Sequence, residues 1–318
     1  MRLRERLCWI AMGAVRAVAP AALCLQTTMV LSTALGQQSS VAEAPKKVQT
    51  SPQAEDSKAL RFVKVDREGE SPRSLQTAIA RYEIISGDFK GRTVDLIGAV
   101  HIGSKEYYTE LNKRFKKYDA VLYELVADAA ANRPELREEG GFNPLAGLQS
   151  GMKDALNLSY QLTEIDYSPA NFVHADMSPS EFSKDMKDRK DSFVGMFARM
   201  MGAGIVEQST KKGQQQQADM MAAMLSRDPI RMRRVLAEQF DNMEGQMAGF
   251  ADKNGKSTIL TERNRKAFEV LQQELEAGKK SLAVFYGAAH LKDMHERLLN
   301  EFNAELITQE WLDAWPLK

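Results

Sequence analysis

The stretch from Val94 to Glu124 constrains the fold most strongly, because it predicts two short apolar strands joined by one amphipathic helix. The first strand ends at His101, the helix is expected over Lys105–Lys117, and the second strand ends near Glu124. A strand, a helix and a strand in this order form a βαβ unit, whose crossover makes the two strands parallel. We therefore expect His101 and Glu124 at the same edge of one sheet.

The Gly-x-x-His pattern of this stretch occurs a second time, much later in the chain. Gly98 and His101 form the first copy, and Gly287 and His290 form the second, after an apolar run over Ser281–Tyr286 that predicts a buried strand. A glycine at a strand end lets the backbone turn sharply and lets a ligand approach closely. We expect the two histidines to share one site.

A further strand is predicted over Asn171–Ala175, and it places His174 and Asp176 at its end. In an open parallel sheet, ligands bind beyond the carboxyl ends of the strands. His101, Glu124 and His290 map to that same edge. For His174, a purely structural hydrogen bond at the strand end is an equally good interpretation.

Two imidazoles and a carboxylate form a nitrogen and oxygen ligand set that suits manganese, cobalt, iron or zinc and leaves positions for water. The sequence therefore predicts a divalent transition metal held by His101, His290 and Glu124. His174 and Asp176 are candidates to complete this ligand set, or to orient a ligand from behind.

Two residues are expected to take part in catalysis. Glu124 either binds the metal or acts as the general base that takes a proton from water, and the sequence leaves both roles open. Arg263 lies on a helix predicted over Leu260–Leu275. It is expected to stabilise an oxyanion or a substrate carboxylate, with a plain surface ion pair as the alternative.

The fold class predicted for residues 61–318 is a single α/β domain, with a mostly parallel central sheet flanked by helices. From about 180 to 250 the sequence has a helical composition rich in methionine, which predicts two or three inserted helices. Core packing in a helical hairpin is favoured for these methionines over a soft substrate groove. A last strand is expected over 304–307, before an aromatic tail.

The N-terminal residues have the features of an export signal. A basic start precedes a long apolar stretch, and Ala34–Gly36 presents small residues at the spacing of a signal-peptidase site. We expect residues 1–36 to be a signal peptide, or an uncleaved anchor, and residues 37–60 to be a disordered linker. The protein is therefore expected in the periplasm or outside the cell, and at a membrane only if the segment is uncleaved.

Composition limits which metal ligands and which kinds of partner are expected. Cys8 and Cys24 both lie in the predicted signal peptide, so the mature chain has no thiolate for a disulfide or a metal site. The 43 lysines and arginines equal the 43 aspartates and glutamates, so no net charge favours nucleic acid. The expected partner is a peptide or small-molecule substrate.

The motifs GAVHIGSKEYYTEL, DAVLYE, TERN and VFYGAAHLKDM resemble, in order and spacing, the TraB/GumN (PrgY) family. That family is similar to the TIKI-type metalloproteases and, more remotely, to the erythromycin esterase and ChaN-like proteins. The resemblance extends from about Leu75 to Trp315 and implies an α/β core, inserted helices and a metal-dependent hydrolytic centre. The residues that it implies for this centre are His101, Glu124, His290 and Arg263.

Together, these patterns predict an exported metal-dependent hydrolase that acts on a peptide or amide bond. Relatives in the family include peptidases, proteins thought to inhibit peptide pheromones, and haem or iron binders. The alternative is therefore a non-catalytic module that holds a peptide, haem or iron ligand at the same place, with help from the methionine-rich helices.

Overall fold

The computed structural model of the chain describes most of the predicted α/β domain, in residues 60–127, 156–189, 210–243 and 257–318. The predicted signal peptide, nearly all of the predicted linker and parts of the predicted helical insertion lie outside these residues. Within the described ranges, no helix has both the length and the apolar character that crossing a membrane requires.

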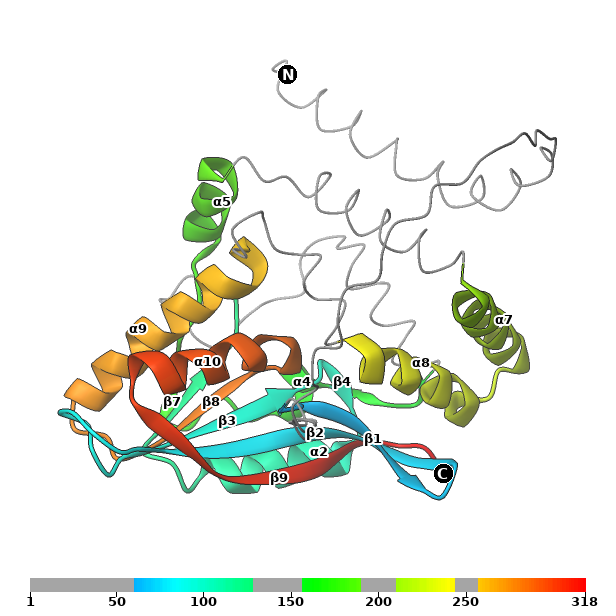
Figure 1. Cartoon of the computed structure of the whole chain (residues 1–318), viewed down its shortest axis with the longest axis horizontal. Coiled ribbons are helices and arrows are strands. Elements are labelled where there is room, and N and C mark those ends of the chain that lie inside the picture. The colour runs from blue at the N-terminus through cyan, green and yellow to red at the C-terminus, as the bar shows by residue number, and fades with distance from the viewer. Residues whose placement is uncertain (1–59, 128–155, 190–209, 244–256) are drawn as a thin grey trace, which may run out of the picture. The chain divides into compact units, whose positions relative to one another are not determined.

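A seven-stranded sheet forms the centre of the domain (Figure 1). Its strands are β1 (Val63–Glu68), β2 (Ser71–Ile84), β3 (Thr93–Ala99), β5 (Ala120–Tyr123), β7 (Phe172–His174), β8 (Ser281–Gly287) and β9 (Ala304–Pro316). The order is β1-β2-β3-β8-β5-β7, and β9 pairs with β2. β3, β8, β5 and β7 run parallel, whereas β1, β3 and β9 each pair antiparallel with β2. The predicted α/β fold is confirmed, with the parallel strands in one half of a mixed sheet.

Helices cover both faces of this sheet. The helices of the described residues are α2 (Lys105–Phe115), α4 (Gln161–Glu164), α5 (Pro179–Asp188), α7 (Lys211–Ser226), α8 (Pro229–Met243), η5 (Thr258–Glu262), α9 (Arg263–Glu276), η6 (Ala288–His290) and α10 (Leu291–Glu301), of which α2 packs on one face and α9 and α10 on the other. Ile97 and Val121 pack into a core with α2, while their neighbours Leu96 and Leu122 pack into a second core with α9 and α10. Alternate residues of each parallel strand thus anchor the sheet in two helical layers.

β8 lies between the two strands of the predicted βαβ unit. α2 connects β3 to β5 as expected, but these strands do not pair with each other, because β8 pairs with both. In the register, Ala99 lies opposite Gly287, and Tyr123 lies opposite Phe285. The strand of the second histidine motif therefore ends between the strand of the first motif and the strand that leads to Glu124.

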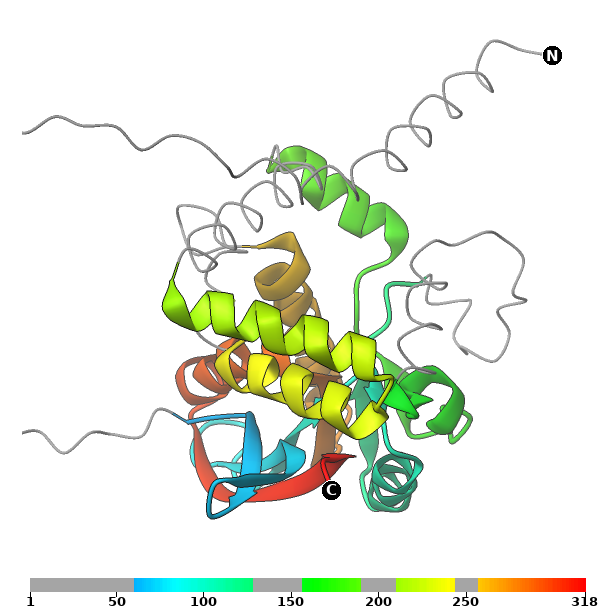
Figure 2. The ribbon, with the colours of Figure 1, turned by 90° about the vertical axis from the view of Figure 1, so that its right-hand side faces the viewer.

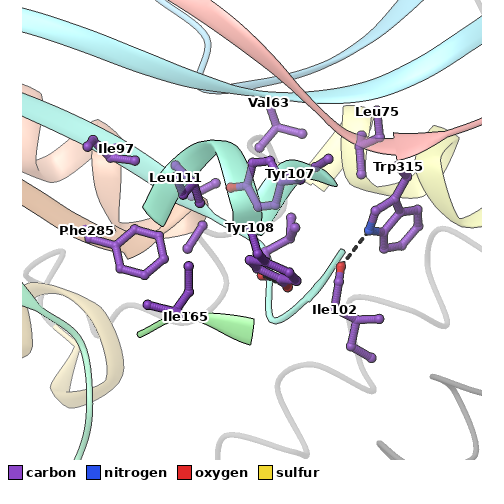
Figure 3. Close-up of a cluster of buried hydrophobic side chains, with 14 of the residues drawn as sticks. Val63, Leu75, Ile97, Ile102, Tyr107, Tyr108, Leu111, Ile165, Phe285 and Trp315 are labelled. Carbon is purple, nitrogen blue, oxygen red and sulfur yellow. Dashed lines mark hydrogen bonds between the residues drawn. The ribbon is translucent and has the colours of Figure 1, made fainter. Parts of the chain in front are cut away.

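The backbone around His101 is held by aromatic side chains of the first core. The indole Nε1 of Trp315 donates to the carbonyl oxygen of Ile102 at 2.6 Å (Figure 3). From α2, two tyrosine hydroxyls donate to the carbonyl oxygens of Gly98 at 2.7 Å and Val100 at 2.8 Å. These bonds restrain the chain directly before and after His101.

The last strand is longer than the sequence predicts. β9 extends from Ala304 to Pro316 instead of ending near 307, because it pairs with almost the whole length of β2. The predicted aromatic tail is therefore strand. Trp311 lies under the ammonium group of Lys64, which is 4.2 Å from its ring centroid. Charged residues before and after the tryptophans interrupt the alternation of apolar and polar positions that would predict a strand.

The described part of the predicted insertion is helical, and α7 and α8 lie side by side (Figure 2). α8 packs on β1, where Arg67 Nη2 donates to Glu238 Oε2 at 2.6 Å. The methionines are not uniformly in the core: Met186 is 6% exposed, whereas Met221 is 50% and Met224 is 60% exposed. Core packing thus accounts for only some of them.

Candidate functional site

The carboxylate of Glu124, directly after β5, is the centre of a buried polar cluster. Its Oε1 accepts a hydrogen bond from Arg263 Nη2 at 2.7 Å, and its Oε2 accepts one from the N–H of Gly287 at 2.7 Å. Burial raises the pKa of Glu124, but in the acid range where this carboxylate titrates the protonated His290, the Arg263 guanidinium, the protonated His101 and the Gly287 N–H outweigh it and lower the pKa to about 2. Glu124 is therefore ionised at neutral pH.

The glycines of the two motifs are required by close packing. A Cβ on Gly287 would lie 3.2 Å from Glu124 Oε2, and its backbone φ of −48° is accessible to any residue. A Cβ on Gly98 would lie 3.3 Å from the carbonyl oxygen of Ala78 on β2. Gly287 thus makes room for the carboxylate, and Gly98 makes room for the neighbouring strand.

His290 is 5% exposed and is held by Asn264. The Asn264 Nδ2 donates to the His290 carbonyl oxygen at 3.2 Å and to Asp293 Oδ2 at 2.8 Å, so the Oδ1 is the atom that faces His290 Nδ1 at 2.6 Å. An amide oxygen only accepts, so Nδ1 carries the proton. Burial lowers the pKa of His290, which leaves a neutral ring with a lone pair on Nε2, 3.6 Å from Glu124 Oε1.

Arg263 is buried and is clamped between two carboxylates. Its Nε and Nη2 donate to the two oxygens of Asp176 at 2.9 and 2.5 Å, in addition to the bond to Glu124. The Asp176 side chain has no exposed surface. In the described part of the chain, Arg263 Nη1 has no hydrogen-bond partner. Arg263 is therefore no surface ion pair, and Asp176 holds it in place.

Arg263 directly follows a π-helical turn, which positions it at the cluster. The π-helical turn η5 directly precedes α9, and such turns are frequent at functional sites. Three consecutive polar residues, Glu262, Arg263 and Asn264, are buried at this junction. Arg263 can thus reach Glu124 while the next residue, Asn264, reaches His290.

His101 lies on the open side of the cluster and is exposed. Its Nδ1 is 3.3 Å from Gln161 Oε1, and Gln161 is a buried residue that the sequence analysis did not identify. The charge of His101 contributes to the lowered pKa of both Glu124 and His290, so His101 is within electrostatic range of both. His101, Glu124 and His290 thus follow the carboxyl ends of β3, β5 and β8, which are neighbouring strands of the sheet.

His174 is at the same edge of the sheet, but its ring contacts the backbone. Its Nε2 is 2.6 Å from the carbonyl oxygen of Leu125, which can only accept, so Nε2 donates. The ring also meets that of Tyr123 edge-on, with 5.7 Å between the centroids. These contacts favour the structural interpretation of His174 over a metal-binding one.

The donor atoms suit a transition metal. One ion about 2.0–2.2 Å from each of two donors fits the 3.6 Å between His290 Nε2 and Glu124 Oε1. Within residues 60–127, 156–189, 210–243 and 257–318, no three histidine, cysteine or acidic side chains are close enough together to hold an ion. The described residues thus bring two of the predicted ligands, His290 and Glu124, close together, and His101 acts on both through its charge.

Comparison of the chain with protein-family models, with curated proteins and with solved structures finds no match. Any assignment of function therefore depends on the motifs of the sequence and on the geometry of this cluster.

Proposed function

We propose that this chain is an exported metal-dependent hydrolase of the TraB/GumN type, which cleaves a peptide or amide bond. The observation that carries the proposal is the pair formed by His290 and Glu124. An unprotonated, buried imidazole nitrogen lies 3.6 Å from an ionised carboxylate oxygen, and two such acceptors are stable side by side when they share a cation. The N-terminal sequence supports the export.

The residues have separate roles in this proposal. A divalent transition metal held by His290, Glu124 and His101 would lower the pKa of its bound water and polarise the scissile carbonyl. Glu124 supplies negative charge and does not take up the proton, because a carboxylate with a pKa of about 2 is a weak base at neutral pH. Of the two roles that the sequence leaves open for Glu124, the proposal therefore takes that of a metal ligand.

Arg263 acts on the substrate in this scheme. Asp176 and Glu124 hold its Nε and Nη2, which leaves Nη1 available as a donor. A guanidinium fixed in this way stabilises an oxyanion or binds a substrate carboxylate without reorganising. Asp176 serves to orient the guanidinium.

Metal analysis tests the proposal directly. The chain without residues 1–36 is purified, reconstituted with manganese, cobalt, iron or zinc, and compared with His101→Ala and His290→Ala. We expect one bound metal in the parent and a marked loss in both variants, while His295→Gln, outside the cluster, retains it. Unchanged metal in both variants, or no metal in the reconstituted parent, contradicts the proposal.

Hydrolysis by the metal-loaded protein is the second measurement. We expect turnover of a fluorogenic peptide library, and we expect Glu124→Gln to abolish it. Turnover that persists in Glu124→Gln would remove Glu124 from the proposed centre.

A second candidate function is supported by the exposed methionines of α7. Met221, Met224 and Leu225 are 50%, 60% and 81% exposed at helical spacing, and flexible methionine surfaces suit a bound peptide, haem or iron ligand. In that case, titration with haem or peptide shows binding that Met221→Ser and Met224→Ser weaken, and no library member is hydrolysed. Hydrolysis that depends on Glu124 decides against it.

A further inference from the structure

Gln161 and Asn264 are buried amide residues, and each contacts one motif histidine at two points. The Gln161 backbone N–H donates to the carbonyl oxygen of His101 at 3.0 Å, while its Oε1 lies 3.3 Å from Nδ1 of the same histidine. The Asn264 Nδ2 donates to the carbonyl oxygen of His290 at 3.2 Å, while its Oδ1 lies 2.6 Å from Nδ1. Each amide residue thus binds its histidine at the ring and at the backbone.

Two pure acceptors fix the orientation of the Asn264 amide, and a tyrosine hydroxyl accepts from the NH₂ group of Gln161. The Gln161 Nε2 donates to the hydroxyl of Tyr167 at 3.0 Å. The Asn264 Nδ2 donates to Asp293 Oδ2 at 2.8 Å, and Arg297 Nε donates to the same oxygen at 2.8 Å. Since the NH₂ groups are engaged there, the amide oxygens are left to face the imidazoles. Gln161 and Asn264 are 4% and 0% exposed, so both amides are held inside the protein.

We propose that Gln161 and Asn264 are positioning residues that keep His101 and His290 in the Nδ1–H tautomer, with both Nε2 atoms free to accept. A neutral imidazole carries one proton, and the bond made by one nitrogen determines which nitrogen is left as an acceptor. Under the proposed function, on which the use of these nitrogens rests, both become metal ligands. The tautomers themselves are a property of the metal-free protein.

His174 provides an internal reference for this assignment. Its Nε2 donates to the Leu125 carbonyl oxygen, so its proton is on the opposite nitrogen from the one predicted for His101 and His290. A single spectrum of the folded protein therefore contains both tautomers.

Nitrogen NMR of the histidine rings tests the proposal. The metal-free chain without residues 1–36 is labelled with ¹⁵N-histidine and studied at mildly alkaline pH, and the rings are assigned with single His→Gln variants. We expect Nδ1–H for His101 and His290 and Nε2–H for His174. In Gln161→Leu the His101 ring becomes a mixture of tautomers, and in Asn264→Leu the His290 ring does.

Conservative and control variants separate positioning from a structural role. Gln161→Glu keeps an acceptor at Nδ1 of His101, so it retains the Nδ1–H signal of that ring. Asn112→Leu removes an amide that bonds only the backbone of Glu164 and Asp166, and it leaves all histidine signals in place. If Asn264→Leu does not fold, Gln161→Leu and Gln161→Glu carry the test.

The result that overturns the proposal is an Nε2–H ring at His101 or His290 in the parent, or unchanged tautomers in the folded leucine variants. Metal titration is then measured separately, and we expect affinities about 10- to 100-fold weaker in the leucine variants. A parent with the predicted tautomers that binds no metal refutes the proposed hydrolase and leaves the positioning role standing.

Discussion

The two Gly-x-x-His motifs have the same spacing and end neighbouring strands, yet their histidines are in different surroundings. His290 is buried in the short turn η6, which continues into α10. His101 is exposed in a bend before β4 (Ile102–Gly103), which pairs with β6 (Ser159–Tyr160). The motif thus places each histidine just after the end of a strand, and the element that follows determines how exposed its side chain is.

The site therefore has a buried side, at His290, and an exposed side, at His101. His290 has its Nδ1 bonded at 2.6 Å by a residue with no exposed surface, whereas the corresponding bond of His101 is 3.3 Å long. When protonated, both rings lower the pKa of Glu124. The following changes test how far the two sides differ.

The largest effect is expected for Glu124→Gln, which removes the negative charge of the carboxylate at the centre of the cluster. Arg263 then loses one of its two buried carboxylates, and loss of a buried ion-pair partner costs up to about 3–5 kcal/mol. Urea denaturation measures the free energy of unfolding. Glu310→Gln, which breaks an exposed pair with Arg114, is the matched control, with an expected cost below about 1 kcal/mol. Equal effects would mean that the cluster does not stabilise the fold.

The next effect distinguishes the histidines themselves. His290→Ala leaves the buried Asn264 oxygen without its donor, which costs about 1–3 kcal/mol of unfolding free energy. His101→Ala, at an exposed position, should stay within about 0.5 kcal/mol. Thermal and urea unfolding of the two variants measure the difference. Similar losses in both would show that exposure does not separate the motifs.

The glycines should differ in what they disturb. Gly98→Ala pushes against the carbonyl oxygen of Ala78, so it should cost about 1–3 kcal/mol of stability, as overpacking does. Gly287→Ala pushes against the Glu124 carboxylate and removes no backbone bond, so it should weaken metal binding more than it weakens the fold. Parallel measurements of unfolding and metal affinity test this contrast. The reverse ranking would contradict the packing described here.

The smallest effect is a dependence of stability on pH. Burial lowers the pKa of His290 below its ordinary value of 6.5, so below that pH the unfolded chain binds a proton that the folded chain does not. Stability therefore falls as the pH falls below 6.5, by at most about 1.4 kcal/mol per pH unit for this group. His290→Gln should flatten the curve in that range. His295, whose pKa burial also lowers, gives the remaining slope.

Glu124 acts in a lower range of pH. Its pKa lies near 2 in the folded chain and ordinarily at 4.5, so its contribution is complete above 4.5 and is lost as the pH falls toward 2. Acid titration should therefore show the parent more stable than Glu124→Gln above pH 4.5, with the two stability curves converging as the pH falls toward 2.

The elements and their strand ends could be predicted from the sequence because their signals are local. Ser104 has the position of a helix cap, and its hydroxyl accepts the N–H of Tyr107 at 3.2 Å as such a cap does. The capping box of Ser178 and Glu181 begins α5 in the same way. The α/β class follows from these alternating elements.

The order of the strands and the supports of the histidines could not be predicted. Nothing in β3 or β5 encodes that β8 lies between them, because this depends on packing between distant segments. Gln161 supports His101 from 60 positions away, and a lone buried glutamine has no periodic signature. His295 has charged neighbours, which predict a solvated ring, yet its Nδ1 lies 2.8 Å from the Tyr82 hydroxyl.

The position of β8 also has a consequence for how the chain is made. Until Ser281–Gly287 leaves the ribosome, β3 and β5 have no strand between them, and neither can complete its hydrogen bonds by pairing with the other. Contacts between such distant segments slow folding, because a long loop must close before they form. The parallel half of the sheet therefore forms only after most of the chain has been synthesised. No shorter fragment is expected to assemble the cluster around Glu124.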